Sequence, residues 1–430
     1  MDRLLRPVLA SLCLLAALAH GYLLAFHRSF GFRDFDIHRE VGRRFLSGEY
    51  LYAGDFCYAY MPIAAMYFSP LALLERNIGL MFRYGLAVGC LVATVFLFHR
   101  MVAPSGASQK NLYVLGAGAI LLVFQFVLQD LDDGGPHLIL LGILSSAIYS
   151  VWRKRECLGS LLFGLSIALK CTPAMFLLLF FWKRQWKLLA YTILATAFWI
   201  MTPMLWMGPM SWWTHQVEWT RNAVLSMLDQ QVGIRQQNEQ RIRNQALRPT
   251  LLRYLITYPD DYPMRGNDKA YVPILDLPPH VANVCVVAAG LGLLGLFARS
   301  SSRSFESRGD RAWPRDCAVV LVLALLLSPM TWQQHLVWLL PAAFVILASV
   351  RARGELYKTE WFMLGAYIVL TMVLNYEVLG KPRFEMLLSY HPFGVAMLLL
   401  FGLVITSSGT TRPVMVLGEE AQKSVPETSW

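Results

Sequence analysis

Long apolar runs recur along almost the whole chain, and they constrain its fold more than any other feature. They extend over Pro7–Phe26, Ile78–Phe98, Leu112–Leu128, Leu138–Trp152, Leu158–Trp182, Leu188–Trp206, Val281–Ala298, Ala318–Leu327, Leu336–Val350, Trp361–Leu374 and Phe393–Ile405. A run of roughly 20 apolar residues is long enough to cross a bilayer as a helix. Only 15% of the residues are charged, whereas soluble proteins carry about 25% charged residues. The sequence therefore predicts an all-α polytopic membrane protein.

The basic residues lie between the apolar runs and indicate the orientation of the chain. They gather in four connectors, Arg153–Arg155, Lys183–Lys187, Arg299–Arg315 and Arg351–Arg353. Such connectors remain in the cytoplasm in membrane proteins. We therefore interpret the net charge of +10 as the charge pattern that orients membrane spans and not as a sign of nucleic-acid binding. The first apolar run also resembles a cleavable signal peptide, but further runs follow, so we expect an uncleaved anchor with a cytoplasmic N-terminus.

The run Leu158–Trp182 has basic connectors at both ends, so both ends are predicted to lie on the same side. It is too short to cross the membrane twice at full length. Lys170 and Pro173 stand at its middle, so we expect two half-length helices that meet at a bend near the outer face. A lysine at such a depth is a candidate functional residue, although a lysine that only reaches toward the interface remains the alternative.

The first polar stretch, Phe32–Tyr52, follows the first run and is predicted to be external. A helix is expected from Asp36, with an apolar face and a polar face. The apolar face holds Ile37, Val41, Phe45 and Leu46, and the polar face His38, Arg39, Arg43 and Arg44. This amphipathic pattern is typical of a helix on the membrane surface. Asp34 and Asp36 either carry chemistry or cap this helix. The segment Tyr58–Leu74 holds Pro62 and Pro70, and the count of crossings predicts that it is re-entrant or interfacial.

Other polar groups are predicted to face outward as well. The stretch Met207–His280 carries tryptophans typical of a lipid interface and arginines, including Arg248 and Arg253, that either bind a phosphate or contact lipid headgroups. Asp130, Asp132, Asp133 and His137 lie in another external connector. Among these groups there is no serine or cysteine nucleophile motif and no phosphate-binding glycine loop. A carboxylate, a histidine and cations suit group transfer from a lipid phosphate, which needs a general base and positive charge.

Five separated motifs resemble those of glycosyltransferase family 87, a GT-C family of polyprenyl-phosphate-sugar-dependent enzymes. They are D-F-x-x-x-R with G-E-x-L-Y (Asp34, Phe35, Gly48, Tyr52), Y-x-P with S-P-L (Tyr60, Pro62, Pro70), L-K-x-T-P (Lys170, Pro173), N-Q-A-L (Asn244, Gln245), and S-P-x-T-W-x-x-H (Ser328–His335). They occur in the family's order over about three quarters of the chain. Two motifs depart from the pattern: the family's G-Q-x-N is Gly134-Gly135-Pro136-His137 here, and its usual paired histidines are Gln334-His335.

The resemblance implies a GT-C bundle of about 11–12 transmembrane helices, some half-length, in one domain over residues 1–408. An external first loop (27–76) supplies an aspartate base, Asp34 on the matching positions. A long external loop spans 207–280, and 409–430 form a flexible cytoplasmic tail. The implied location is the bacterial cytoplasmic (inner) membrane, with both termini in the cytoplasm and the site facing outward.

The predicted reaction is an inverting single displacement that moves one sugar, mannose or another hexose or pentose, from a polyprenyl-phosphate donor to a lipid or glycan acceptor. The predicted catalytic residues are Asp34 and His335, with Lys170, Arg248 and Arg253 holding the phosphate. The predicted substrate-binding residues are Tyr60, His137, Asn244, Gln245 and Trp332. No cofactor is expected, although Asp130, Asp132 and Asp133 leave a divalent metal open. A transporter or flippase of lipid-linked sugars and a glycan polymerase or ligase remain the alternatives.

Overall fold

A computed structural model describes residues 15–27, 34–53, 58–102, 109–224, 242–257, 274–301 and 312–407. Throughout these ranges the regular structure is helical, and no β-strand occurs in them. The prediction of an all-α polytopic membrane protein is confirmed. The tail 409–430, and residues 225–241 and 258–273 of the long loop, lie outside the described residues.

The helices of the first half are the following. An N-terminal helix covers Leu15–His27, followed by α2 (Asp34–Ser47), α3 (Pro62–Ala72), α4 (Arg76–Val102), α5 (Gln109–Leu122), α6 (Phe124–Asp133), α7 (His137–Trp152), α8 (Glu156–Leu169), the short 3₁₀ helix η2 (Thr172–Ala174), α9 (Met175–Trp182), α10 (Trp186–Met201), α11 (Met204–Met207) and α12 (Pro209–Trp219), which η3 (Thr220–Val224) extends.

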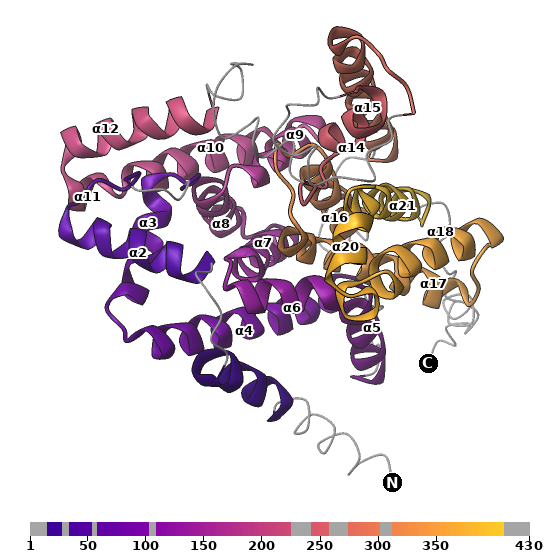
Figure 1. Cartoon of the computed structure of the whole chain (residues 1–430), viewed down its shortest axis with the longest axis horizontal. Coiled ribbons are helices and arrows are strands. Elements are labelled where there is room, and N and C mark those ends of the chain that lie inside the picture. Colours follow the sequence, from indigo (N-terminus) through magenta and orange to yellow (C-terminus); the bar gives the residue numbers. More distant parts are fainter. Residues whose placement is uncertain are drawn as a thin grey trace, which may run out of the picture.

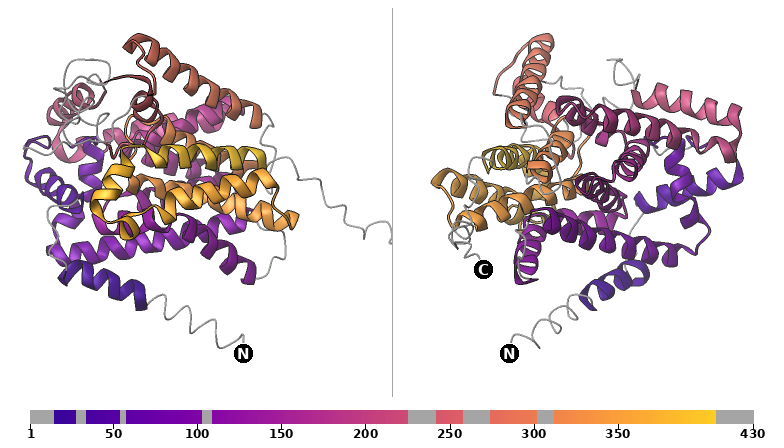
Figure 2. Two further views of the ribbon diagram at one scale, coloured as in Figure 1. Left: turned by 45° about the vertical axis from the view of Figure 1, so that its right-hand side comes forward. Right: turned by 180° about the vertical axis from the view of Figure 1, so that it is seen from behind.

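The helices of the second half are α14 (Leu247–Leu255), α15 (Pro279–Ser300), α16 (Ala312–Leu326), the 3₁₀ helix η6 (Gln333–Leu339), α17 (Leu340–Arg353), α18 (Lys358–Ile368), which η7 (Val369–Val373) continues, α19 (Tyr376–Leu379), α20 (Lys381–Leu388) and α21 (Pro392–Thr406). Figure 1 shows α7 and α16 near the middle of the molecule, with the other helices around them, and Figure 2 shows α15 standing at one edge.

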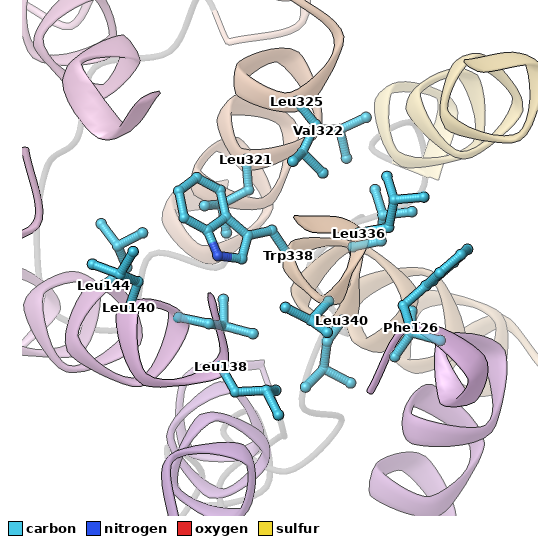
Figure 3. Packing of buried hydrophobic residues seen from close by; sticks show 14 of the residues in the cluster. Phe126, Leu138, Leu140, Leu144, Leu321, Val322, Leu325, Leu336, Trp338 and Leu340 are labelled. Carbon is cyan, nitrogen blue, oxygen red and sulfur yellow. The ribbon is translucent and has the colours of Figure 1, made fainter. Parts of the chain in front are cut away.

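The core is built on helices that are apolar on all sides. α16 is buried along almost its whole length, and so is most of α7. A helix without a polar face lies in the interior because it has no side that favours water. Trp338 of η6 fills the space between these helices, surrounded by leucines of α7 and α16 (Figure 3). Its indole N–H donates to the carbonyl of His137 at 3.1 Å, which ties η6 to the first turn of α7.

Within the described residues, four helices are long and apolar enough to cross a membrane, and up to six spans result if each of two bent pairs counts as one. The four are Arg76–Val102, Trp186–Met207, Pro279–Ser300 and Gln333–Arg353. Shorter apolar helices, His137–Trp152 and Glu156–Leu169 among them, accompany them. These short helices match the expectation of half-length elements, while the number of crossings stays a prediction.

Two local predictions can be compared directly with the structure. The chain does break at Lys170, which ends α8 in an extended conformation (φ −154°, ψ 123°) before η2 and α9 begin. The helix after Asp34 also forms, but His38 lies on its buried face, so its placement on the polar face was wrong. That buried face packs against α3, where a Cβ on Gly42 would lie 2.8 Å from the carbonyl oxygen of Phe68.

Candidate active site

A cavity of about 480 Å³ lies between α2, the stretch 58–61, the break after α8, the end of α12 with η3, the end of α16, and the loop 327–335. Most of its wall is apolar or aromatic. The chemically active groups on the wall are Asp34, His38, Tyr60, Lys170, Trp332 and His335. Sequence segments about 300 positions apart thus meet here, as the contact between Gln334 and Asp34 shows. This is the arrangement of a small-molecule site, which is mostly apolar with a few placed polar groups.

Asp34 is the first residue of α2 and lies on the cavity wall. The next residue, Phe35, is buried against Gly134, where a Cβ atom would lie 2.5 Å from Cβ of Phe35. This close packing fixes the start of the helix. The amide of Gln334 donates to Oδ2 of Asp34 at 3.4 Å. Burial and, second, the negative charge of Asp133 raise the pKa of Asp34 to about 6, which suits a general base near neutral pH.

Asp36 has a different environment. Arg76 at the start of α4 donates to both of its carboxylate oxygens, at 2.7 and 2.8 Å. Asp36 is not part of the cavity wall. The helical pattern left each acidic residue as either a cap or a chemical group, and the fold separates them: Asp34 faces the cavity, and Asp36 links the first loop to α4.

Lys170 is held by two histidines. Its Nζ donates to Nε2 of His137 at 2.9 Å and to Nε2 of His335 at 3.2 Å. The two imidazole rings lie with their centroids 4.2 Å apart. Because Lys170 ends α8 in an extended conformation, its side chain leaves the helix axis and reaches the cavity wall. An ammonium carries three N–H donors, so one remains for an oxygen atom in the cavity.

A second layer of polar groups lies behind His137. Its Nδ1 donates to Oδ1 of Asp130 at 2.9 Å, and Arg83 donates to Oδ2 of Asp130 at 3.0 Å. Arg83 also donates to the backbone oxygen of Gly135. Arg83, Asp130 and His137 are 2%, 0% and 1% exposed, so this layer does not contact the cavity. His137, predicted to bind substrate, lies in this layer and contacts Lys170.

Asn244 and Gln245 were predicted to bind substrate, and neither lies on the cavity wall. Asn244 donates to the carbonyl of Pro329 at 3.0 Å and accepts from the backbone of Thr331 at 2.9 Å. The backbone of Gln245 donates to Thr331 at 2.8 Å. The stretch 329–331 before Trp332 and His335 is not helical, so its backbone groups need hydrogen-bond partners from elsewhere. Asn244 and Gln245 provide such partners.

Arg248 and Arg253 were predicted to hold the phosphate, but the structure places both away from the cavity wall. Arg248 donates to the side chain of Asn283 on α15 at 2.8 Å. Arg253 is buried and donates to the backbone oxygen of Ser389. Both side chains therefore connect α14 to neighbouring helices, and Lys170 is the cation of this trio that reaches the cavity.

The three carboxylates of the acidic cluster on α6 have different partners. Asp130 faces Arg83 and His137, Asp132 lies 3.3 Å from Nε2 of His20, and Asp133 accepts from Gln129 at 2.8 Å. No group of three or more His, Cys, Asp or Glu side chains with the spacing of a metal site occurs in the described part of the chain.

Two residues of the site have no counterpart in the sequence predictions. Arg83 had a visible signal, because it is an arginine inside the apolar run Ile78–Phe98, where charge is costly and marks function or a partner. Gln334 stood out only as the residue in place of one of the family's paired histidines, and its contact with Asp34 is seen only in three dimensions.

The aromatic part of the wall carries polar atoms that have no hydrogen-bond partner among the described residues. They are Nδ1 of His38, the hydroxyl of Tyr58 and Nε1 of Trp332. All three residues line the cavity. Burial lowers the pKa of His38 to about 3, so its imidazole is uncharged. Uncharged donors and acceptors on aromatic rings suit a ligand that presents hydroxyl groups and apolar faces together.

Comparison with known proteins gives a consistent result. A family model described as Glycosyltransferase family 87 matches residues 58–259. A Mycobacterium tuberculosis protein, a polyprenol-phosphate-mannose-dependent alpha-(1-2)-phosphatidylinositol mannoside mannosyltransferase, is 26% identical over 372 residues, which cover 80% of this chain and 78% of that protein. A Mycolicibacterium smegmatis protein of the same description is 25% identical over 81% of this chain and 77% of its own length. A second M. smegmatis protein, described as a pentamannoside mannosyltransferase, is 26% identical over 80% of this chain and 75% of its own length.

Proposed function

We propose that this chain, which belongs to glycosyltransferase family 87, transfers a single sugar from a polyprenyl-phosphate sugar to a glycolipid or glycan acceptor at the outer face of the bacterial cytoplasmic membrane. The observation that carries the proposal is that Asp34 and Lys170 face one cavity, so a base and a cation can act on the same reacting centre. The relatives use a polyprenol-phosphate-mannose donor and act on phosphatidylinositol mannosides, which makes mannose the first sugar to test and a mannoside lipid the first acceptor.

The proposed chemistry is a single displacement at the anomeric carbon. The acceptor oxygen forms a bond to that carbon while the bond from carbon to the phosphate oxygen breaks. The acceptor proton passes to the carboxylate of Asp34, and the electron pair of the broken bond stays on the phosphate. One displacement inverts the anomeric configuration. A positioned general base contributes about 100- to 10,000-fold to the rate of such a step.

Lys170 supplies the positive charge that the leaving group needs. The donor phosphodiester carries one negative charge, and the released polyprenyl phosphate carries a second. A cation beside the phosphate oxygen therefore stabilises the transition state more than the bound donor, which is the condition for catalysis. His335 holds Lys170 from the cavity side and lines the cavity itself. We assign charge stabilisation to these side chains and not to a divalent metal, because the carboxylates of α6 are each engaged elsewhere.

The first test is sugar transfer in oriented membrane vesicles. Labelled undecaprenyl-phosphate mannose is supplied to right-side-out and to inverted vesicles that contain the protein, with EDTA present in a parallel sample. We expect label to pass to lipid or glycan in right-side-out vesicles, with or without EDTA. Transfer only in inverted vesicles would contradict the outward orientation. Movement of the intact donor across the membrane would indicate a transporter, and transfer of a preassembled oligosaccharide alone would indicate a polymerase or ligase.

The pH dependence of transfer tests Asp34 as the base. The carboxylate is the active form, and burial and the charge of Asp133 raise its pKa to about 6. We therefore expect kcat/KM to be constant above about pH 7 and to fall about tenfold per pH unit well below pH 6. Asp133→Asn removes a negative neighbour, so the acid limb should move to lower pH. An acid limb that does not move in this variant would assign the titration to another group.

A further inference from the structure

The departure of Gly134-Gly135-Pro136-His137 from the family pattern coincides with a continuous chain of buried contacts. The chain runs from Arg83 on α4 through Asp130 on α6 and His137 on α7 to Lys170, with contacts of 3.0, 2.9 and 2.9 Å. We propose that Asp130 and His137 are positioning residues that hold the Lys170 ammonium toward the phosphate of the polyprenyl-phosphate substrate. This inference rests on the phosphate role of Lys170 in the proposed function.

Asp130 fixes the tautomer of His137. Asp130 as a carboxylate accepts hydrogen bonds only, so Nδ1 of His137 must carry the proton and Nε2 must present a lone pair. That lone pair receives an N–H of Lys170 at 2.9 Å. Asp130 thus determines the orientation of the Lys170 ammonium through His137. Other carboxylate–histidine pairs work in the same way, in that the carboxylate selects which ring nitrogen is active.

The local backbone is shaped for this contact. Asp130 also accepts from the backbone N–H groups of His137 and Leu138 at 3.3 and 3.2 Å. A Cβ atom on Gly135 would lie 2.9 Å from Nδ1 of His137 and 3.0 Å from Oδ1 of Asp130. Only glycine leaves room for the imidazole to approach the carboxylate here. Gly135 and His137 are therefore both required for the contact between the imidazole and Asp130.

The two histidines also fix the position of the Lys170 side chain. Its side chain has several single bonds, and an unsupported lysine pays conformational entropy to hold one position. The two imidazoles, His137 from behind and His335 from the cavity side, use two of its three N–H donors at 2.9 and 3.2 Å. The remaining donor then has a fixed direction. Loss of the Asp130 carboxylate would let Nε2 of His137 carry the proton and repel the lysine N–H.

The test measures binding of undecaprenyl phosphate to the purified full-length protein in nanodiscs, together with donor KM and kcat. We expect Asp130→Asn and His137→Leu each to weaken binding and raise donor KM by about 10-fold, the lower end of the effect of outer-layer partners at other sites. His137→Gln places an amide oxygen near the position of Nε2, where it can accept from Lys170, so it should retain most of the binding. In that background Asp130→Asn should add little further loss, because the imidazole that it controls is gone.

The matched control is Asp316→Asn. Asp316 is as buried as Asp130 and pairs with Lys183 at 2.7 Å, so this variant should lower thermal stability without changing phosphate binding. If Asp130→Asn and His137→Leu behave like Asp316→Asn, or if Asp130→Asn and His137→Gln weaken binding additively, the positioning role is overturned. A wild-type protein that binds undecaprenyl phosphate in this way but transfers no sugar would overturn the proposed function and leave the positioning role standing.

Discussion

Asp34→Asn is expected to lower the rate of sugar transfer by about 100- to 10,000-fold while the protein remains folded. The amide keeps the size of the side chain and an oxygen that can accept from Gln334, which donates to Asp34 at 3.4 Å. It cannot take a proton from the acceptor hydroxyl. The measurement is transfer of label from undecaprenyl-phosphate mannose, made on protein whose melting temperature and donor binding match those of the wild type. Any residual activity should also lose the acid limb near pH 6, because the group that titrates is gone.

Asp36→Asn is the matched control, since it makes the same chemical change two residues away in the same helix. Asp36 pairs with Arg76 at 2.7 and 2.8 Å, and that pair is partly exposed. We expect a small loss of stability, of the order of 1 kcal/mol or less, and most of the activity retained. Substantial activity in Asp34→Asn, or an inactive Asp36→Asn beside an active Asp34→Asn, would remove Asp34 from the role of base.

Lys170→Met is expected to weaken donor binding and to lower the rate of transfer as well. Methionine keeps much of the length of the side chain but removes the charge. A hydrogen bond to a charged group contributes about 1.5 to 3 kcal/mol, which corresponds to roughly 10- to 150-fold in affinity. The effect on kcat should be additional, because the negative charge on the phosphate grows as the bond breaks. Donor KM and kcat are measured separately, so that ground-state binding and transition-state stabilisation can be distinguished.

Lys183→Met is the control for this change. Lys183 is a second buried lysine, and it pairs with Asp316 at 2.7 Å. Its replacement should lower the melting temperature, because a buried carboxylate loses its partner, but should leave donor KM unchanged. A Lys170→Met protein that loses stability and keeps normal donor binding would show that Lys170, too, is a structural residue.

Several features of this protein follow from local sequence patterns. The apolar runs predict an all-α membrane protein, since backbone groups in lipid must be satisfied within each segment. The break at Lys170 follows from a charged residue and Pro173 in the middle of one run, and the structure confirms it. The helix after Asp34 follows from its apolar spacing. Motif order, read in one dimension, is also enough to indicate the family.

The partners of the site residues follow from the tertiary structure alone. Lys170 and His335 are 165 positions apart, and Asp34 and Gln334 are 300 apart, so no local pattern can pair them. The prediction that Arg248 and Arg253 reach the phosphate was drawn from charge and loop position, whereas the tertiary structure packs both side chains of α14 against neighbouring segments and away from the cavity wall.

The same difference between local sequence pattern and tertiary structure applies to three further residues, Asn244, Gln245 and His137. Their motifs mark them as candidates, and the fold places them away from the cavity wall, in contact with the loop 329–331 or with Lys170. The raised pKa of Asp34 likewise depends on burial and on Asp133, which lies about a hundred residues away in the chain. Sequence alone determined that this is an all-α membrane protein and which groups stand near the ends of its apolar segments, because helix formation and burial in lipid act over a few turns. Only the packing of those helices decided which groups meet, because hydrogen bonds and desolvation act over a few ångströms in space, whatever the separation along the chain.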